Sequence, residues 1–455
     1  MYMKILNQAL LFTCALLIWS CDRSVNAQET LPSVKELTDD ELLDVVESTH
    51  LDYMWTGAEP TSGMAYERIH LDGNYNGMDP SIVTTGGTGF GIAGIIVGME
   101  RGWITRQDGV ARLQKIVDYL ATADRFHGVW PHWLNGGTGK VVPFGTKDNG
   151  GDLVETSFLL EGLLCARQYM NRKDDAEKRV AEGIDELWKT VEFDWYTKGG
   201  QNVLYWHWSP NYQWEMNLPI RGYNECLIVY VLAASSPTHT IGKDCYEKGW
   251  ARNGAIRSSA APYGYPLDLS HNGAGELGGP LFWAHYSWIG LCPKGLKDQY
   301  ADYWHVTANH AMSDYAYCVE NPKHYVGYGA NCWGLTASYS PEPVGYAAHA
   351  PNNDLGVITP TAALSSFPYT PEQSMAALRN FYSKKAWLWG KYGFYDAFSL
   401  NPSWAPPRYL AIDQLTIAPM IENYRTGLLW ELFMSCPEIQ AGLTKLGFTY
   451  TINGK

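Results

Sequence analysis

The sequence predicts an all-α protein whose helices form an (α/α)6 barrel, with six outer and six inner helices. Two features of the chain point to this fold. Helices with one charged face alternate strictly with helices that are apolar nearly all round. The loops that precede the apolar helices are long, whereas the connections that follow them are mostly a few residues. In such a barrel the inner helices run parallel, so their N-terminal ends and the long loops meet on one face.

The amphipathic helices are predicted on the outside of the barrel, because only one of their faces needs to be buried. The first opens with Thr38-Asp39-Asp40-Glu41, which favours a capped helix start. The six outer helices are expected over residues 38–56, 105–123, 174–191, 240–252, 298–318 and 371–386.

The apolar helices open with Gly, Asn, Asp or Pro and must be buried, which places them in the inner ring. The long loops that lead into them hold most of the Gly, Trp and Asn, and such loops on a compact scaffold indicate binding or catalysis. A solenoid of helical pairs would share the alternation, but it would not need such asymmetric loops and would usually show repeat sequence. The inner helices are expected over residues 85–100, 152–170, 224–236, 279–291, 359–367 and 414–434, with a terminal helix at 437–447.

The N-terminal segment has the pattern of an export signal, with Lys4 followed by an apolar run that is short for a membrane span. Two processing points are candidates, Val25-Asn26-Ala27 and the lipobox-like Ile18-Trp19-Ser20-Cys21. We expect a signal over residues 1–27, a tether over 28–34 and a single catalytic domain over 35–455. The protein is then periplasmic or anchored to the outer membrane, and it touches the membrane only through a lipid on Cys21.

Export would allow disulfides, but the seven cysteines that follow Cys21 are scattered, and four of them sit in or beside apolar helical runs. Buried free thiols are therefore expected.

Composition narrows the class of partner. The 455-residue chain carries 34 Lys and Arg against 47 Asp and Glu, without a basic run that could neutralise a phosphate backbone, so nucleic acid is excluded. Its 19 Trp and 30 Tyr exceed what packing needs. Flat amphipathic rings stack on the apolar faces of sugars, although core packing explains any single Trp equally well. The composition therefore favours an oligo- or polysaccharide as the partner.

The stretch from Lys147 to Glu155 places three carboxylates and two glycines at the start of an otherwise apolar helix. Asp152 and Glu155 have the spacing of a capping box, so we assign Glu155 to the helix cap. Asp148 lies in the Gly-rich turn ahead of the helix and has no such role. We expect Asp148 and Asp152 to face a ligand.

Two other loops each deliver a carboxylate to the same rim. In Arg221-Gly222-Tyr223-Asn224-Glu225, Asn224 can cap the following helix, and Glu225 falls in its first turn. Neighbouring carboxylates would raise the pKa of Glu225 and suit it to general acid catalysis, whereas the helix dipole would lower it. Asp413, which precedes the last inner helix, is either a cap or a buried working carboxylate.

Two carboxyl groups that flank one bond are what glycoside hydrolysis requires, roughly 6.5–9.5 Å apart for attack by water and about 5 Å apart for direct attack. Rings and hydrogen-bond donors in the same loops could bind the sugar, with loop packing as the alternative for each. The candidates for substrate binding are Arg68, Trp133, Trp206, Trp208, Arg221, Trp333, Trp404, Arg408 and Tyr409.

No cofactor or metal is expected. The histidines, His132 and His207 among them, are scattered without the close pairing of a zinc site. Neither a Gly-Lys-Ser/Thr phosphate loop nor a Gly-x-Ser-x-Gly nucleophile elbow is present in the sequence.

Five ordered stretches carry a family resemblance that covers essentially the whole mature chain. They are Asp148-Asn-Gly-Gly-Asp152-Leu-Val-Glu155-Thr, Arg221-Gly-Tyr-Asn-Glu225, Tyr328-Gly-Ala-Asn-Cys332-Trp-Gly-Leu-Thr-Ala-Ser338, Thr359-Pro-Thr-Ala-Ala-Leu-Ser-Ser-Phe-Pro368 and Ala411-Ile-Asp413-Gln. Together they resemble the glucoamylase-like proteins of Bacteroidetes in glycoside hydrolase family 144, the β-1,2-glucanases.

The resemblance implies an (α/α)6 barrel that cleaves β-1,2-glucan, within the chain or by releasing sophorose from an end, with inversion by analogy to related barrels. By motif, Asp148, Asp152 and Glu225 match the family's candidate acidic residues, and Asp413 is a further candidate. Our hypothesis is a glycoside hydrolase with Glu225 as general acid and one of Asp148, Asp152 or Asp413 positioning water.

Two rival functions remain open. A polysaccharide lyase on the same barrel would use a Tyr or His base on an acidic sugar, although a net charge of −13 would repel an anionic polymer. A non-catalytic glycan-binding lipoprotein would use the carboxylates only as helix caps.

Overall fold

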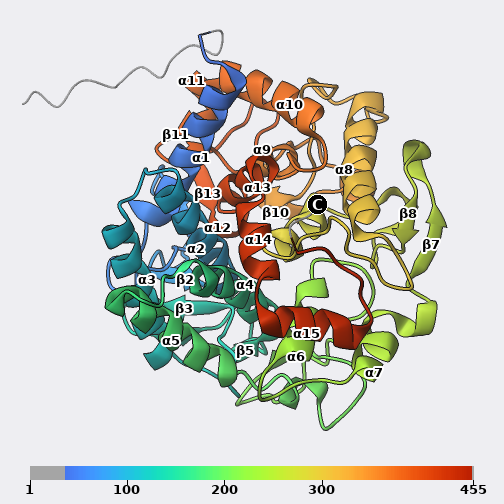
Figure 1. Cartoon of the computed structure of the whole chain (residues 1–455). Helices are drawn as coiled ribbons and strands as arrows, with labels where there is room; N and C mark the ends of the chain where they lie inside the picture. The colour runs from blue at the N-terminus through green and yellow to red at the C-terminus, as the bar shows by residue number, and fades with distance from the viewer. Residues whose placement is uncertain (1–35, 453–455) are drawn as a thin grey trace, which may run out of the picture.

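The computed structural model describes residues 36–452, a helix-rich body whose short strands lie in the loops (Figure 1). The expected export signal, the tether and Cys21 lie outside the described residues. No helix within 36–452 is both long enough and apolar enough to cross a membrane. The seven cysteines of this part are free and buried, as predicted.

Five of the six predicted amphipathic helices are confirmed as full helices, and they lie at the periphery of the view in Figure 1. Polar side chains cap the N-terminal ends of three of these helices. Thr38 and Glu41 form a capping box, and Thr105 and Asp174 accept backbone N–H groups of the first turns. The segment expected at 240–252 is shorter, with one α-turn followed by a π-helical turn, Tyr246–Trp250. These helices are α1 (Asp39–Trp55), α3 (Arg106–Thr122), α5 (Asp175–Lys189), α7 (Lys243–Cys245), α8 (Tyr303–Glu320) and α10 (Pro371–Ser383), which α11 (Lys385–Leu388) follows.

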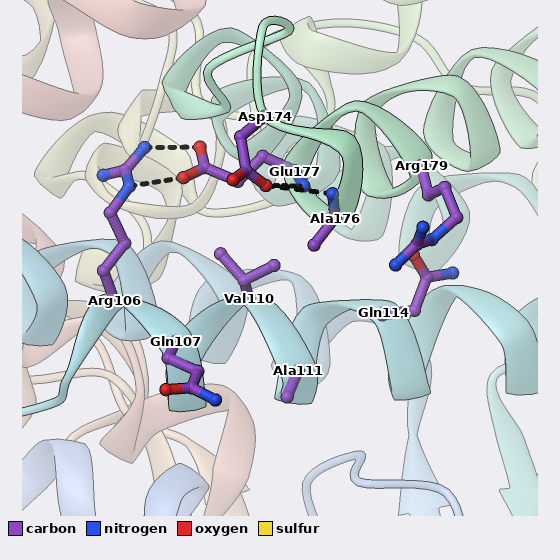
Figure 2. A pocket seen from close by; sticks show the side chains of 9 residues that line it. All are labelled: Arg106, Gln107, Val110, Ala111, Gln114, Asp174, Ala176, Glu177 and Arg179. Carbon is purple, nitrogen blue, oxygen red and sulfur yellow. Dashed lines mark hydrogen bonds and ion pairs between the residues drawn. The ribbon is translucent and has the colours of Figure 1, made fainter.

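An ion pair joins α3 to α5 on the outer wall. Arg106 donates through Nε and Nη2 to the two carboxylate oxygens of Glu177, at 2.7 and 2.6 Å (Figure 2). Beyond this pair, a groove of about 540 Å³ runs between the two helices over Val110 and Ala111. The ion pair therefore links the N-terminal end of α3 to the N-terminal end of α5.

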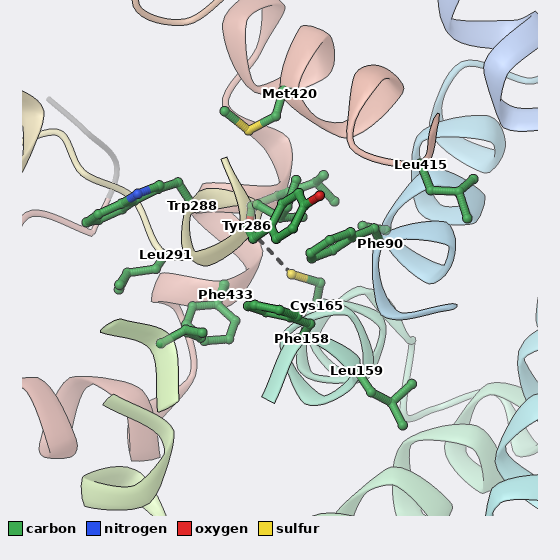
Figure 3. Packing of buried hydrophobic residues seen from close by; sticks show 14 of the residues in the cluster. Phe90, Phe158, Leu159, Cys165, Tyr286, Trp288, Leu291, Leu415, Met420 and Phe433 are labelled. Carbon is green, nitrogen blue, oxygen red and sulfur yellow. Dashed lines mark hydrogen bonds between the residues drawn. The ribbon is translucent and has the colours of Figure 1, made fainter. Parts of the chain in front are cut away.

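The apolar helices are buried and contribute to one continuous core. In Figure 3 the rings of Phe90, Phe158 and Tyr286 meet in the middle of that core, with centroids 5.2–5.5 Å apart. The helix expected at 414–434 is divided, and Gly427, with φ of 78°, separates its last two parts. The apolar helices are α2 (Thr85–Glu100), α4 (Leu153–Tyr169), α6 (Leu227–Ser235), α9 (Pro360–Leu364), α12 (Ala411–Gln414), α13 (Ile417–Arg425) and α14 (Leu428–Met434), followed by the predicted terminal helix α15 (Pro437–Leu446).

The prediction of an inner helix at 279–291 is wrong. This segment forms two 3-10 turns, Leu281–Ala284 and Tyr286–Trp288. The backbone N–H groups of Gly290 and Leu291 donate to the buried carboxylate of Glu161, at 2.8 and 3.0 Å, instead of to helix carbonyls. An acceptor from α4 thus competes with the local helix, which apolar periodicity alone does not reveal.

The all-α prediction omitted thirteen short strands in residues 36–452. They pair loops that are distant in sequence; β1 lies antiparallel to β13, which joins the loop after α1 to the loop before α12. The other strands form one three-stranded sheet, β2–β3–β4, and the pairs β5–β6, β7–β8, β9–β10 and β11–β12. The strands are β1 (Arg68–His70), β2 (Ile82–Thr84), β3 (Trp133–Asn135), β4 (Val141–Val142), β5 (Gly151–Asp152), β6 (His207–Trp208), β7 (Arg257–Ala260), β8 (Leu267–Leu269), β9 (Ala337–Tyr339), β10 (Tyr346–Ala348), β11 (Trp389–Gly390), β12 (Gly393–Phe394) and β13 (Arg408–Leu410).

Glycines allow α2 and α4 to pack backbone to backbone. A Cβ atom on Gly89 would lie 2.1 Å from the carbonyl oxygen of Phe158, and one on Gly162 would lie 2.0 Å from the carbonyl oxygen of Gly89. Neither carbonyl can rotate away, because each belongs to a helix backbone. Any side chain at these two positions must therefore push the helices apart.

We predict that Gly89→Ala lowers the free energy of unfolding by about 2–3 kcal/mol, through overpacking against a backbone that cannot yield. Gly94→Ala in the same helix is the matched control, because its Cβ would meet only Leu51 Cδ1 at 3.3 Å. This control should stay within about 1 kcal/mol of the wild type, since alanine also favours the helix. Urea unfolding of both variants measures the difference, and equal stability would refute the proposed constraint.

Candidate active site

A cleft lies where the loops before the apolar helices meet. Its inner part is a cavity of about 420 Å³ lined by three carboxylates, Glu67, Glu155 and Glu225. Its outer part, about 530 Å³, shares Arg68 and Tyr346 with the inner part. We call the two parts together the cleft.

Glu225 lies just before α6, with its side chain in the inner cavity and only 8% of the residue exposed. The Asn224 side chain accepts the N–H of Cys226 at 3.0 Å and so forms the turn that leads into the helix. Carboxylate atom Oε2 has no hydrogen-bond partner among residues 36–452. Burial, reinforced by Glu155 and Asp152, raises the pKa of Glu225 to about 7. Of the opposing influences that the sequence predicted, those that raise the pKa dominate.

The prediction that Glu155 serves the cap of α4 is wrong. Asp152 does cap the helix, since its Oδ1 accepts the N–H groups of Val154 and Glu155 at 3.0 and 2.9 Å. The Glu155 carboxylate instead accepts the N–H of Gly86 on α2 at 2.8 Å and lines the cavity. Burial raises its pKa to about 7, although nearby His132 opposes the shift. The carboxyl group of Glu155, which the sequence assigned to the helix cap, therefore belongs to the candidate active site.

His132 connects the carboxylates of the site. Its Nδ1 lies 3.0 Å from Asp152 Oδ2, and its Nε2 lies 3.9 Å from Glu155 Oε1. Burial opposes the charged ring, but Glu155 and Asp152 outweigh burial and raise the pKa of His132 to about 9. The imidazolium is therefore the stable form at neutral pH, and it favours the ionised form of Glu155.

Asp148 and Asp152 lie behind the cavity wall rather than in it, at 5% and 0% exposure. His207 Nδ1 is 3.2 Å from Asp148 and 3.8 Å from Asp152, and Trp206 Nε1 donates to Asp152 at 3.3 Å. Burial opposes ionisation of Asp152, but His207 and His132 lower its pKa. Neither aspartate is among the residues that line the inner cavity. Their side chains contact His132 and Trp206, which do line it, and His207, which does not.

The histidines described as scattered gather at this point, because the pairing of β5 with β6 sets Asp152 opposite His207. Donor atoms of His132, Asp148 and Asp152 lie within 4.8 Å of one another, which is close enough to hold a metal ion. Both oxygens of Asp152 already accept N–H groups, however, and the pKa values of both histidines are raised. Protonated imidazoles can therefore balance the carboxylates without a metal.

Asp413 is buried beneath the cavity floor, where it meets Asp396. Tyr286, which lines the cavity, donates its hydroxyl to Asp413 at 2.9 Å, and the N–H of Tyr339 donates to Asp396 at 2.9 Å. Burial and the facing carboxyl of Asp396 raise the pKa of Asp413, and burial raises that of Asp396 to about 7. The carboxyl of Asp413 keeps its proton and can donate it to the carboxylate of Asp396, so the pair carries one negative charge.

The predicted substrate-binding residues divide into two groups. Arg68, Trp133 and Trp206 line the inner cavity, and Trp404 and Arg408 line the outer part of the cleft. The others lie outside the cleft. Trp333 and Tyr409 are 0% exposed and pack in the core, Trp208 meets His127 edge to face, and Arg221 donates to the carbonyl of Lys248 on the surface. The two buried rings cannot contact a ligand, so their assignment is corrected.

Several cavity residues were missed from the sequence. Phe144 is 54% exposed and stacks on His132 with centroids 4.2 Å apart, and Tyr346 is 53% exposed beside Arg68. Glu67 forms an ion pair with Arg68 and lines the same wall. Position in the long loops was the available signal for all three, but it applied equally to many other loop residues.

Comparisons with known proteins match this chain over most of its length. A family model described as "Putative glucoamylase" matches residues 217–437. The solved endo-β-1,2-glucanase of Chitinophaga pinensis, in complex with sophorotriose and glucose, is 61% identical, with 91% of this chain and 99% of that chain covered and a TM-score of 0.89. A β-1,2-glucanase structure from Parabacteroides distasonis is 44% identical, with 90% and 60% covered and a TM-score of 0.85.

A curated relative, the exo β-1,2-glucooligosaccharide sophorohydrolase (non-reducing end) of Parabacteroides distasonis, is 45% identical over 450 residues. The match covers 94% of this chain but 61% of that protein, so this chain spans less than two thirds of the relative.

Proposed function

This chain belongs to glycoside hydrolase family 144, the glucoamylase-like β-1,2-glucanases, and on that premise we propose that it hydrolyses β-1,2-glucan, within the chain or by releasing sophorose from an end. One observation carries the proposal: two carboxyl groups with pKa values of about 7, Glu155 and Glu225, line one cavity among aromatic side chains. The lyase alternative has less support, because Tyr286 in this cavity donates to a carboxylate and its pKa is raised, so it is a poor base.

In the mechanism we propose, Glu225 is the general acid and Glu155 is the general base. Glu225 gives its proton to the glycosidic oxygen as that bond to the anomeric carbon breaks. A water molecule attacks the same carbon from the opposite face and gives one proton to Glu155. Solvent then removes the proton from Glu155 and returns one to Glu225, so each turnover consumes one water and leaves the enzyme unchanged.

The remaining acidic residues act as positioning groups in this proposal. Asp152 holds His132, and the His132 charge favours the carboxylate form of Glu155. Asp148 holds His207. Asp413 fixes the hydroxyl of Tyr286 in the floor. The role of water positioning that the sequence offered to these aspartates passes to Glu155, because Glu155 lines the cavity and they do not.

The cleft suits a chain of sugars. Trp133, Trp206 and Phe144 offer aromatic rings in the inner part, while Arg68 and Arg408 offer donors in the outer part, which Tyr346 also lines. We infer that the glucan chain runs from the inner cavity into the outer part, past Trp404.

We also propose that the helices complete an (α/α)6 barrel, in which the two 3-10 turns of 281–288 stand in place of one inner helix. The order of α1 to α6, amphipathic and apolar in turn, supports this arrangement. Export to the periplasm or outer membrane stays a proposal that rests on the N-terminal sequence, and cell fractionation tests it.

Glu225→Gln should lower kcat on β-1,2-glucan by about 10²–10⁴-fold, because the amide cannot donate a proton to the leaving oxygen. Release of reducing sugar measures the rate, and circular dichroism checks the fold. Glu100→Gln, an exposed carboxyl at the end of α2, is the control and should keep full activity. Unchanged turnover by a folded Glu225→Gln protein would refute the assignment.

The dependence of kcat/KM on pH should be bell-shaped around pH 7. Above that pH Glu225 loses the proton it must donate, and below it Glu155 gains a proton and cannot act as base. His132→Gln removes a cation beside Glu155, so it should move the acid limb towards higher pH and leave the alkaline limb in place. A wild-type optimum between pH 4 and 5 would contradict the role given to burial.

The first product should be the α-anomer, because a single displacement by water inverts the configuration of a β-linkage. Proton NMR during the first minutes of reaction, before mutarotation, distinguishes the anomers. Initial release of the β-anomer would mean a covalent intermediate and would overturn the role of Glu155 as a base.

A further inference from the structure

A second aromatic surface lies apart from the cleft. Trp195 and Trp214 line a cavity of about 560 Å³, and none of its lining residues lines either part of the cleft. Their ring centroids are 6.4 Å apart with an angle of 32° between the planes. We call these two tryptophans the platform.

The platform is held rigidly although Trp195 is 39% exposed. Trp195 begins a 3-10 turn and lies between two buried aromatic residues, Phe193 and Tyr196. The His127 ring stacks on one face of the Trp195 indole with centroids 3.6 Å apart and an angle of 14°, and Trp208 meets the indole edge to face at 6.1 Å. The indole is thus fixed in place before any ligand arrives, which reduces the entropic cost of binding.

Trp214 is fixed in the same way. Tyr196 and Tyr205 meet its ring edge to face, with centroids 5.9 and 5.8 Å away. Its neighbours Tyr212 and Met216 are both 37% exposed. Exposed apolar side chains on both sequence flanks of Trp214 favour contact with a partner, whereas a single exposed ring would not.

Polar side chains surround the rings. Glu192, Asp194, Lys198 and His239 line the same cavity, and His239 Nδ1 lies 3.0 Å from Asp194 Oδ1. The combination of a ring face with carboxylates, an ammonium and an imidazole at its edge matches a pyranose, which has an apolar face and a rim of hydroxyl groups. A protein partner would instead favour a continuous apolar patch with few charges at its centre.

We propose that the platform is a second carbohydrate-binding site, which holds a neutral glucan chain while another part of that chain occupies the cleft. Trp195 supplies the stacking face, and Asp194 and His239 accept and donate hydrogen bonds at the hydroxyl rim. The identity of the polymer as β-1,2-glucan rests on the proposed function, whereas the binding of a pyranose chain does not. Two linked contacts raise the effective concentration of the polymer at the cleft.

Native electrophoresis in gels that contain β-1,2-glucan tests the platform, with Glu225→Gln as the background so that the polymer stays intact. Adding Trp195→Ala should weaken retention roughly fivefold, the loss expected for one stacking contact. His239→Gln, which keeps the indole, should weaken it less. Tyr424→Ala, which removes an aromatic ring of 42% exposure on α13, is the control and should leave retention unchanged.

Turnover separates this site from the cleft. In the active protein, Trp195→Ala should leave kcat/KM on a short β-1,2-glucooligosaccharide unchanged and raise KM on the long polymer. Retention that Trp195→Ala does not alter overturns the proposal, and so does a size-exclusion shift from dimer to monomer without loss of retention. A chain that turns over no glucan yet is retained through Trp195 would support the platform and refute the proposed function.

Discussion

The contact between α2 and α4 is the constraint on which the site depends. Because Gly89 and Gly162 have no side chains, the two helices approach until backbone meets backbone. Only at that separation does the N–H of Gly86, in the first turn of α2, reach the carboxylate of Glu155, in the first turn of α4. The close packing of α2 against α4 in the core therefore places the carboxylate of Glu155 in the inner cavity. The rings of Phe90 and Phe158 fill the space just below it.

The acidic side chains in and around the cleft differ in the charges that surround them. The aspartates behind the wall are paired with imidazoles, while the buried Asp396 and Asp413 share a proton. Glu155 and Glu225 have neither form of compensation in full. Burial therefore raises both of their pKa values into the neutral range, where proton transfer in either direction costs little. Acid–base chemistry is therefore assigned to the two acids that both line the inner cavity and have pKa values near neutrality.

Periodicity predicted the long helices well, because burial of a whole apolar helix leaves a strong trace in sequence. It failed at 279–291, where Glu161 of another helix takes the N–H groups of Gly290 and Leu291. Motif reasoning placed Glu225 in the cavity and assigned Glu155 to a cap, since its competing donor, Gly86, is 69 residues away in sequence. Trp333 and Tyr409 were predicted to bind sugar because they are aromatic residues in or beside the long loops. The structure shows that other side chains cover both rings completely.

The pairing of β1 with β13 has a consequence for how the protein is made. Arg408 reaches back across 336 residues to Asp72, and both segments border the outer part of the cleft. Closing so large a loop comes late, since the entropy of a long connection must be lost before its contacts form. During synthesis the helices up to α10 can pack while the cleft is still open on one side. The last strand then completes the groove, and α12 to α15 follow it to pack against α1, α2, α4 and α6. A chain cut short before Arg408 would therefore lack both a finished cleft and part of the core that supports it.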